Sequence, residues 1–319
     1  MKLMIVGAGV IGTLVGWALS DAGFDVVHFV RPGRMLKYQE GTWIDVLDKR
    51  KGHKAQYTEK YSLKSVESVS QSNGFNFVIV PVKHYQLEDT LRQIVPALEN
   101  ANYLLLTQNW KGSREIDTLL SPSRYLFGDI KAGGGFRDGK LVSTIKAIDL
   151  GQVNNRHEEC LGTAIDLFRS ADFKVTVQEN ILHYLWVQYA INGGLWPILV
   201  RAGSFKSAIS DRKLGDLGYF SVKECLKVVA HRGVDLKKYP DAQMYSGTSF
   251  LSRRLAGIIL KYMFTHDEYV KRNSVHALSD PKEIKTFYSD IVTTGRELGI
   301  DMPIMNGFMQ DINDLVSLR

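Results

Sequence analysis

The sequence predicts an α/β protein of two domains: a doubly wound parallel sheet of the N-terminal Rossmann type, followed by an all-helical domain. The first 34 residues have the order strand, glycine-rich turn, helix, strand. Apolar, β-branched runs typical of buried parallel strands then recur as far as residue 177. After residue 180 they give way to long segments with helical spacing. We therefore expect a boundary near Gln178, with residues 1–178 and 179–319 as the two domains.

Length and composition narrow the class of protein. The 319 residues exceed one typical domain, and 45% hydrophobic with 23% charged residues is ordinary for a globular protein. No apolar run is long enough to cross a bilayer, and the chain starts with a strand pattern, so we expect a cytoplasmic protein without a membrane partner. Cys160 and Cys225 are too few and too distant for a metal site, which predicts buried thiols and no metal.

The net charge of +6 is spread along the chain. Basic pairs and triplets at residues 49–51, 253–254 and 271–272 form no dense stripe with interleaved aromatic residues. This makes a nucleic-acid partner the least favoured reading. The excess remains compatible with a phosphorylated cofactor and a carboxylate substrate.

The glycine-rich turn is the most informative segment. Residues 2–6 predict a strand, and the Gly-Ala-Gly-Val-Ile-Gly sequence that follows leads into a helix ending near residue 23. In this context the G-x-G-x-x-G pattern is a dinucleotide-binding fingerprint. Gly7 would allow the tight turn, Gly9 the approach of a pyrophosphate, and Gly12 close packing of the helix on its strand. Ala8, Val10 and Ile11 complete the expected cofactor loop.

The end of the second strand, residues 24–30, indicates which dinucleotide binds. An acidic residue there would select NAD through the ribose hydroxyl, whereas a cation accommodates the 2′-phosphate of NADP. Here the position holds Arg31, with Arg34 and Lys37 nearby and no carboxylate in the turn. We therefore expect NADP(H); the alternative is a solvated basic loop.

Two further strands end in polar residues. After a hairpin-like segment around residues 43–58, residues 75–82 predict a buried strand that leads into Lys83. A helix over residues 85–99 precedes a strand over 103–107, followed by Asn109. Ligands of open α/β sheets bind at the carboxyl ends of strands, so both residues could line a nicotinamide and substrate site. A surface lysine and a turn-forming asparagine are equally compatible with the pattern.

The remaining elements complete the two domains. Strands at residues 125–128 and 141–145 flank an expected glycine-rich loop at 133–135, and a helix at 158–171 and a strand at 173–177 close the first domain. A helix over 181–192 should break or kink at residues 193–197, Gly-Gly-Leu-Trp-Pro. Further helices are expected over residues 221–232, 249–264, 281–298, with Asp280 in its cap, and 304–316.

Taken in order, these motifs resemble the ketopantoate reductase family, the NADPH-dependent 2-dehydropantoate 2-reductases. The resemblance runs nearly end to end. It rests on residues 7–12, Arg31, residues 82–86, Gln108, Asn109, Leu185, Trp186, Asn192, Pro197, residues 282–284 and residues 299–303. It implies a Rossmann domain, a helical domain and an active site between them.

The resemblance also implies roles for individual residues. The glycines of the turn would hold the pyrophosphate and Arg31 the 2′-phosphate. Lys83 and Asn109 would line the nicotinamide and substrate cleft. In the helical domain, Asn192 would hydrogen-bond the hydroxy acid, Glu283 its hydroxyl end, and Ser274 its carboxylate.

One departure from the family affects catalysis. Family members carry a general-acid lysine four residues before the asparagine, on the same helical face, and here that position is Gln188. A neutral amide donates a hydrogen bond but releases no proton at neutral pH. Loss of a general acid typically costs ~100-fold to ~10,000-fold in rate. Trp110 and Trp196 would also reshape the pocket.

We consider three proton sources that could replace the missing general acid. Lys83 could serve as the acid; His183 begins the same helix but points elsewhere, because it lies five residues before Gln188. A larger, more aromatic substrate could instead use water.

Two functions follow. The first is an NADPH-dependent reductase of a 2-oxo acid, poorly suited to ketopantoate itself. The alternative is a non-catalytic NADP(H)-binding sensor or partner-binding protein that lost the acid. An imine or opine reductase would need an amine site that the sequence does not reveal. The helical half could support a homodimer, while the natural substrate and stereochemistry stay open.

Overall fold

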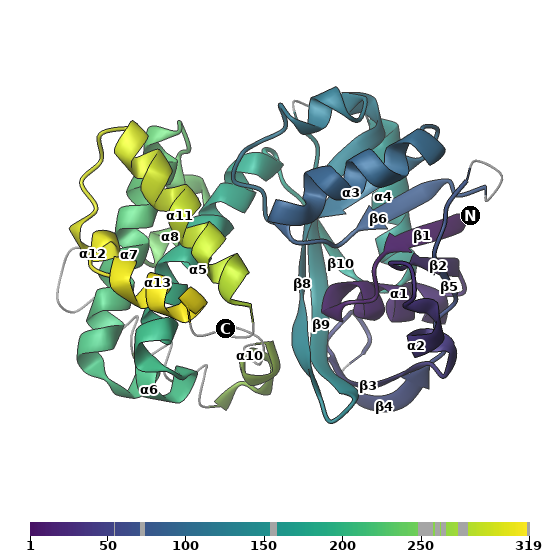
Figure 1. Ribbon diagram of the computed structural model, residues 1–319, viewed down its shortest axis with the longest axis horizontal. Coiled ribbons are helices and arrows are strands. Elements are labelled where there is room, and N and C mark those ends of the chain that lie inside the picture. Colours follow the sequence, from purple (N-terminus) through teal and green to yellow (C-terminus); the bar gives the residue numbers. More distant parts are fainter. Residues whose placement is uncertain are drawn as a thin grey trace. The chain divides into compact units, whose positions relative to one another are not determined.

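The chain forms two compact units. The computed structural model describes residues 1–53, 55–70, 74–153, 158–247, 266–273 and 280–317, with residues 258 and 262 singly. The units span Met1–Leu182 and His183–Arg319, and the division falls in the first turn of a long helix (Figure 1). Most of the helix expected over residues 249–264 lies outside the described residues, as does Ser274.

A parallel sheet forms the centre of the first unit. In spatial order it contains β5 (Ser65–Val66), β2 (Asp25–Phe29), β1 (Lys2–Val6), β6 (Phe77–Val80), β7 (Asn102–Leu106) and the first part of β8 (Tyr125–Arg137). All these neighbours pair in parallel; Met4, for example, lies opposite Val27 and Val78. β1 is therefore central, as a Rossmann-type order requires.

Four more strands widen the sheet beyond β8. β9 (Lys140–Gly151) pairs antiparallel with β8, and β10 (Lys174–Val177) pairs in parallel with β9. β3 (Thr42–Asp48) and β4 (Ala55–Tyr61) form the expected hairpin, which joins the sheet through β9. The described residues thus make one ten-stranded mixed sheet.

The expected loop at residues 133–135 is wrong. These glycines lie inside β8 and pair with β9, while the turn falls at Asp138 and Gly139, both with positive φ. A Cβ on Gly134 would lie 2.3 Å from the carbonyl oxygen of Val142. The glycine therefore permits close approach of two strands, a use that the sequence pattern does not distinguish from a turn.

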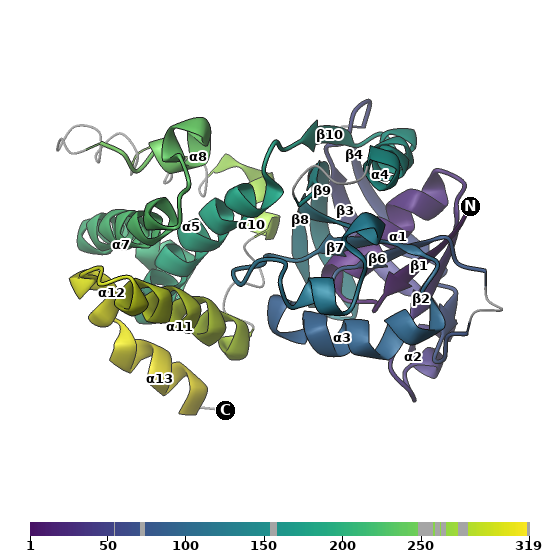
Figure 2. The same ribbon diagram turned by 90° about the horizontal axis from the view of Figure 1, so that it is seen from above.

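Helices cover both faces of the sheet. α1 (Val10–Asp21) and α4 (Glu158–Ser170) share one hydrophobic cluster with the strands. α3 (Leu87–Ile94) lies on the side opposite α4 (Figure 2). This arrangement confirms the doubly wound α/β domain. The short α2 (Met35–Gln39) follows β2. Single 3₁₀ turns occupy His84–Gln86, Val95–Ala97, Ile116–Thr118, Pro122–Arg124 and, in the second unit, Leu236–Lys238.

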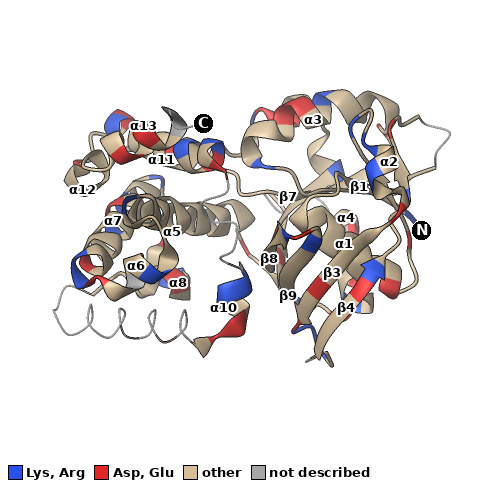
Figure 3. Cartoon of the chain, turned by 60° about the horizontal axis from the view of Figure 1, so that its bottom comes forward, with Lys and Arg blue, Asp and Glu red and all other residues tan. Residues whose placement is uncertain are grey.

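The described part of the second unit is helical, as predicted. Its helices are α5 (Ile181–Ala202), α6 (Phe205–Ser210), α7 (Arg212–His231), α8 (Pro240–Gln243), α10 (Glu268–Asn273), α11 (Pro281–Glu297), α12 (Pro303–Asn306) and α13 (Met309–Ser317). Asp280 caps α11 by accepting a hydrogen bond from the Glu283 N–H, which confirms the predicted start. α11 carries both basic and acidic residues, whereas the charged residues of α13 are acidic (Figure 3). Among the described helices, none has the length and hydropathy that a membrane span needs.

α5 does not break at residues 193–197. It continues through Pro197 to Ala202, although proline removes one internal hydrogen bond. The two preceding glycines serve packing: a Cβ on Gly193 would lie 2.3 Å from Ile291 Cδ1, and one on Gly194 2.7 Å from Val222 Cα. Close contact with α11 and α7 therefore stabilises a segment whose composition alone suggested a break.

Candidate functional site

The turn between β1 and α1 has the shape of a phosphate-binding loop. Gly7 adopts a φ of +87°, which disfavours any residue with a side chain. A Cβ on Gly12 would lie 2.8 Å from the Gly7 carbonyl oxygen, so the helix packs directly on the turn. At Gly9, by contrast, a Cβ would meet no described atom within 4 Å. Backbone conformation explains the glycine at position 7 and close packing explains the one at position 12. At position 9 there is open space.

The start of α1 suits an anion. Gly9 is its N-cap, and within the described residues no side chain caps the helix and its first turn carries no acidic residue. The first N–H groups of a helix and its positive dipole end attract phosphate. Ala8 is buried, while Val10 and Ile11 are half-buried beside the open space. These features fit the pyrophosphate of a dinucleotide.

A buried histidine, missed by sequence reasoning, lies beneath this turn. His28, on β2, donates from Nδ1 to the Gly7 carbonyl oxygen at 2.9 Å, and its Nε2 accepts from the Tyr61 hydroxyl at 3.1 Å. The Gly7 N–H donates to the Phe29 carbonyl oxygen at 2.7 Å. Burial lowers the pKa of His28 to about 4, so the ring is neutral at pH 7. A histidine between apolar residues, Val27 and Phe29, was the available signal.

The basic loop after β2 has an acidic neighbour. Arg31, Arg34 and Lys37 are exposed, as a 2′-phosphate site would need. However, Glu67 accepts a hydrogen bond from the Met35 N–H at 2.8 Å through Oε1. Glu67 directly follows β5, the strand beside β2. The fold thus supplies a carboxylate that the turn's own sequence lacks. A strand of two residues is too short to be predicted from the sequence, so the position of Glu67 was not expected.

Lys83 and Asn109 both follow carboxyl ends of adjacent parallel strands, β6 and β7. Lys83 is half-buried and precedes the 3₁₀ turn at His84–Gln86. Asn109 is buried; it donates from Nδ2 to the Gly112 carbonyl oxygen at 2.6 Å, and its Oδ1 accepts the Gly112 N–H at 3.1 Å. Asn109 therefore closes a turn at this edge, which is the alternative role weighed from the sequence.

Two lysines at the same edge act on a neighbouring histidine. Burial, and then the charges of Lys83 and Lys111, lower the pKa of His84 to about 4. The two loops that follow β6 and β7 therefore bring two lysines close to one neutral histidine. Neither His84 nor Lys111 was singled out from the sequence. Trp110 is buried, with 4% of its surface exposed.

The second unit holds the other expected site residues. Gln188 lies on α5, and its Nε2 donates to Asp241 Oδ2, on α8, at 2.7 Å. Asn192 is half-buried one helical turn further along α5. Glu283 is half-buried in the first turn of α11. Asp241 was not predicted, because nothing in the sequence relates α8 to the middle of α5.

Packing between α5 and α11 fixes where Asn192 and Glu283 lie. The Tyr189 ring stacks on Phe287 with 3.7 Å between centroids, and its hydroxyl donates to Asp290 at 2.6 Å. Burial and the negative charges of Asp290 and Glu283 raise the pKa of Tyr189, so it stays protonated. Glu283 precedes Phe287 by one turn, and Asn192 follows Tyr189 by three residues. Both therefore belong to this seam.

The tryptophans of α5 pack within the helical unit. The Arg232 guanidinium lies 3.6 Å from the Trp186 ring centroid, and His183 stacks on the same ring at 5.5 Å. Burial and neighbouring cations lower the pKa of His183. Trp196 lies 4.4 Å from the Phe287 ring. This geometry gives Trp186 a packing role, and it turns His183 toward the Trp186 ring.

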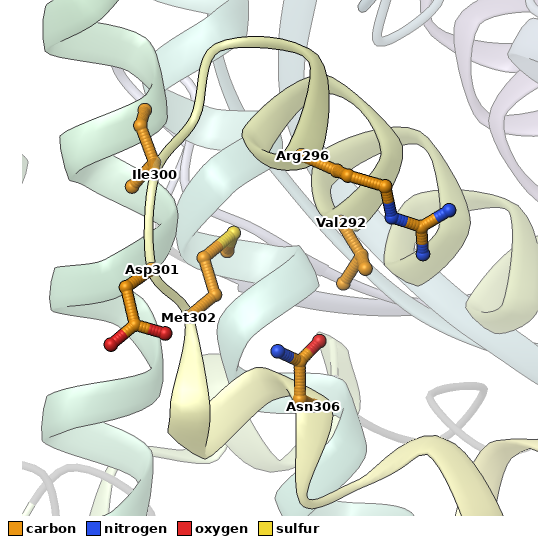
Figure 4. A pocket seen from close by; sticks show the side chains of 6 residues that line it. All are labelled: Val292, Arg296, Ile300, Asp301, Met302 and Asn306. Atoms are coloured by element: carbon orange, nitrogen blue, oxygen red, sulfur yellow. The ribbon is translucent and has the colours of Figure 1, made fainter.

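A small cavity of about 110 Å³ lies at the other end of α11 (Figure 4). Its lining comprises Val292, Arg296, Ile300, Asp301, Met302 and Asn306. Arg296 lies 13 residues from Glu283, or roughly 20 Å along the helix. This cavity is therefore separate from the expected site. In the described ranges, no three His, Cys, Asp or Glu side chains are arranged to hold a metal ion, and both cysteines are buried and free.

A family model and the related sequences point to the same family of proteins. Residues 3–154 match the family model described as ketopantoate reductase PanE/ApbA. The 2-dehydropantoate 2-reductase of Pyrococcus abyssi is 24% identical over 246 residues, which cover 75% of this chain and 77% of that protein. The Pyrococcus horikoshii 2-dehydropantoate 2-reductase is 26% identical over 239 residues, 73% of this chain and 75% of that one.

Solved structures share the fold across both units. The 2-dehydropantoate 2-reductase of Geobacter metallireducens aligns with a TM-score of 0.75 at 16% identity, over 98% of this chain and 99% of that chain. D-mandelate dehydrogenase in complex with NADH also aligns with a TM-score of 0.75 at 16% identity, over 100% of both chains.

Proposed function

Because this chain is a divergent member of the ketopantoate reductase family, whose members are oxidoreductases acting on a carbonyl or hydroxyl group, we propose that it is an NADPH-dependent reductase of a 2-oxo acid. A nicotinamide dinucleotide follows from the family. The preference for NADPH, the substrate class and the residue roles are our proposal.

The glycine turn is the observation that carries this proposal. The positive φ of Gly7 and the close contact at Gly12 explain these two glycines, whereas a Cβ on Gly9 would meet no described atom within 4 Å. The chain's own geometry therefore does not explain the glycine at position 9. A pyrophosphate at the start of α1 accounts for it.

The choice of NADPH rests on the loop after β2. Arg31 occupies the position where a cation accommodates a 2′-phosphate, and Arg34 and Lys37 add positive charge. Glu67 is the counter-argument, because a carboxylate at the end of the neighbouring strand could accept from a ribose hydroxyl. Its hydrogen bond to the Met35 N–H gives it another role. We therefore favour NADPH.

The bound nicotinamide would supply the hydride that adds to the carbonyl carbon. In the proposed site, Asn192 and Glu283 hold the substrate oxygens, and Lys83 polarises the carbonyl and releases the proton to its oxygen. Gln188 contributes only a hydrogen bond, since an amide is no acid at neutral pH. Its donation to Asp241 further limits what it offers to a substrate.

The natural substrate is proposed to be bulkier than ketopantoate. Gln188 replaces the family lysine, so efficient ketopantoate reduction is not expected. D-mandelate dehydrogenase, a structural neighbour, has been solved with NADH and anilino(oxo)acetate, an aromatic oxo acid (TM-score 0.70). Aromatic 2-oxo acids are therefore the first compounds to test, with both NADH and NADPH.

A second candidate is a non-catalytic NADP(H)-binding protein. The Gln188–Asp241 hydrogen bond favours it, because the residue in the general-acid position is neutral and is held by a carboxylate. This candidate predicts dinucleotide binding without substrate-dependent oxidation. A homodimer and a cytoplasmic location remain predictions from the sequence, and sedimentation of the purified protein tests the first.

The deciding assay follows NADPH oxidation against ketopantoate and a series of aliphatic and aromatic 2-oxo acids. Gln188→Lys alone would form an ion pair with Asp241, which would hold the new proton more tightly. We therefore pair it with the double variant Gln188→Lys/Asp241→Asn. Turnover of a bulky oxo acid by the natural protein supports the reductase. Activity gained only in the variants supports the non-catalytic protein, and absence of dinucleotide binding contradicts both.

A further inference from the structure

The Gly7–Ala8 peptide is held from below by one strand. Gly7 has a left-handed backbone, and its N–H donates to the Phe29 carbonyl oxygen at 2.7 Å. Its carbonyl oxygen accepts from His28 Nδ1 at 2.9 Å. Adjacent residues of β2 thus fix both polar groups of the first glycine. Among the described residues, His28 is the side chain that contributes to these two contacts.

The direction of this peptide affects an anion. In a trans peptide, the carbonyl oxygen and the next N–H point in opposite directions. With the Gly7 oxygen turned to His28, the Ala8 N–H points away from His28, and a Cβ on the next residue, Gly9, would meet no described atom within 4 Å. If the peptide turned over, it would present a carbonyl oxygen to the phosphate in place of a donor.

His28 is itself held in place and in one tautomer. The Gly7 oxygen can only accept, so Nδ1 carries the proton and Nε2 accepts from the Tyr61 hydroxyl at 3.1 Å. Tyr61 in turn lies 3.3 Å from the Ser20 hydroxyl. On α1, a Cβ at Gly16 would lie 2.3 Å from His28 Nε2, so this helix leaves the ring just enough room. The network joins β2, β4 and α1.

We propose that His28 is a positioning residue for the dinucleotide: it holds the Gly7–Ala8 peptide in the orientation that offers the Ala8 N–H to the pyrophosphate. This rests on the proposed cofactor site and adds to it a residue outside the glycine motif. It accounts for a fully buried, neutral histidine that lies between the apolar residues Val27 and Phe29 of β2. Tyr61, the titratable group facing the ring, stays protonated because burial raises its pKa to about 12.

Two substitutions separate the two contacts of the ring. His28→Asn places an amide near the position of Nδ1 and can still donate to the Gly7 oxygen. His28→Gln reaches the position of Nε2, keeps a partner for Tyr61 and loses the donor to Gly7. Tyr61→Phe is the matched control, because it removes a buried hydrogen bond from the same network and leaves the Gly7 contact intact.

The test measures the dissociation constant for NADPH by fluorescence titration, with melting temperature recorded for each variant. His28→Gln should weaken NADPH binding on the order of 10-fold, the loss of about one buried hydrogen bond, and raise the KM for NADPH without lowering kcat. His28→Asn should restore affinity to within about 3-fold of the natural protein. Tyr61→Phe should lower the melting temperature and leave affinity unchanged. Equal weakening in His28→Gln and Tyr61→Phe would overturn the proposal.

A second readout does not need the cofactor. Crystal structures of the His28→Gln and natural proteins without ligand should differ in the direction of the Gly7 carbonyl, and an unchanged peptide in the variant would overturn the proposal. If the natural protein binds neither NADPH nor NADH, the proposed function fails and His28 has no cofactor to position. A turned peptide would then show only that His28 shapes the loop.

Discussion

The turn after β1 and the middle of α5 both carry parts of the expected site, but they differ in what the chemistry depends on. At the turn, backbone groups and absent side chains do the work: Gly7 has a positive φ, Gly12 touches the turn, and Gly9 leaves space. On α5 the proposal depends on one side chain, Gln188, which donates to Asp241 and which we propose stands where relatives carry an acid. Backbone geometry tolerates little change, whereas one side chain can be exchanged without disturbing a helix. A divergent protein can therefore keep its cofactor loop and alter its reaction.

The sharpest test of this difference compares two glycines of the same turn. Gly12→Ala would push a Cβ to 2.8 Å from a backbone oxygen, so we expect a loss of several kcal/mol in unfolding free energy, typical of overpacking. Gly9→Ala meets no described atom, so stability should hold while NADPH affinity falls on the order of 100-fold. Denaturant unfolding and NADPH titration of both variants measure the two effects. Equal stability losses would remove the distinction.

The second test concerns the α5–α11 seam. Glu283→Gln should lower kcat about 100-fold or more, because a carboxylate that holds the reacting hydroxyl is lost while its size is kept. The Asp280 cap accepts from the backbone N–H of Glu283 and so survives the change. Lys282→Gln, on an exposed neighbour in the same turn, is the control. Full activity of Glu283→Gln would remove this residue from the site.

The third test asks which side chains select the cofactor. Arg31→Glu should shift the preference from NADPH toward NADH by roughly 10-fold to 100-fold in kcat/KM, as one charged contact to the 2′-phosphate is lost. Glu67→Gln should move the ratio slightly toward NADPH, because it removes a negative charge that is hydrogen-bonded to the loop. Kinetics with both dinucleotides give the ratio. An unchanged ratio in Arg31→Glu would argue against its role.

The sequence predicted best those features that local pattern controls. The glycine turn, the cap at Asp280 and the hairpin at β3 and β4 each depend on neighbouring residues, and the structure contains all three. It failed at residues 133–135 and 193–194, where glycine permits close packing between segments distant in the chain. The same limit hid Glu67 and Asp241. Their roles depend on which strand or helix lies alongside, and no local pattern reports that.

The smallest expected effect again concerns the turn, through pH. His28 is neutral in the folded protein because burial lowers its pKa to about 4, whereas the unfolded chain binds a proton near pH 6.5. Stability should therefore fall as pH drops from about 6.5 and level off near 4, with a total loss of about 3 kcal/mol from this group.

His28→Asn lacks the titration, so its unfolding free energy should fall less over that range. His84→Asn is the comparison. His84 lies in the loop after β6 and also has a pKa lowered to about 4, but the proposal gives it no role at the glycine turn. Parallel pH profiles for natural and His28→Asn proteins would mean that the folded ring takes up its proton at the same pH as the unfolded chain. Below that pH a protonated ring could not accept from Tyr61. We expect the unfolding free energy of both variants to depend less on pH, and NADPH affinity to change only with substitutions at His28. That result would show that the neutral His28 ring acts on the glycine turn, and that burial of a histidine elsewhere does not have this effect.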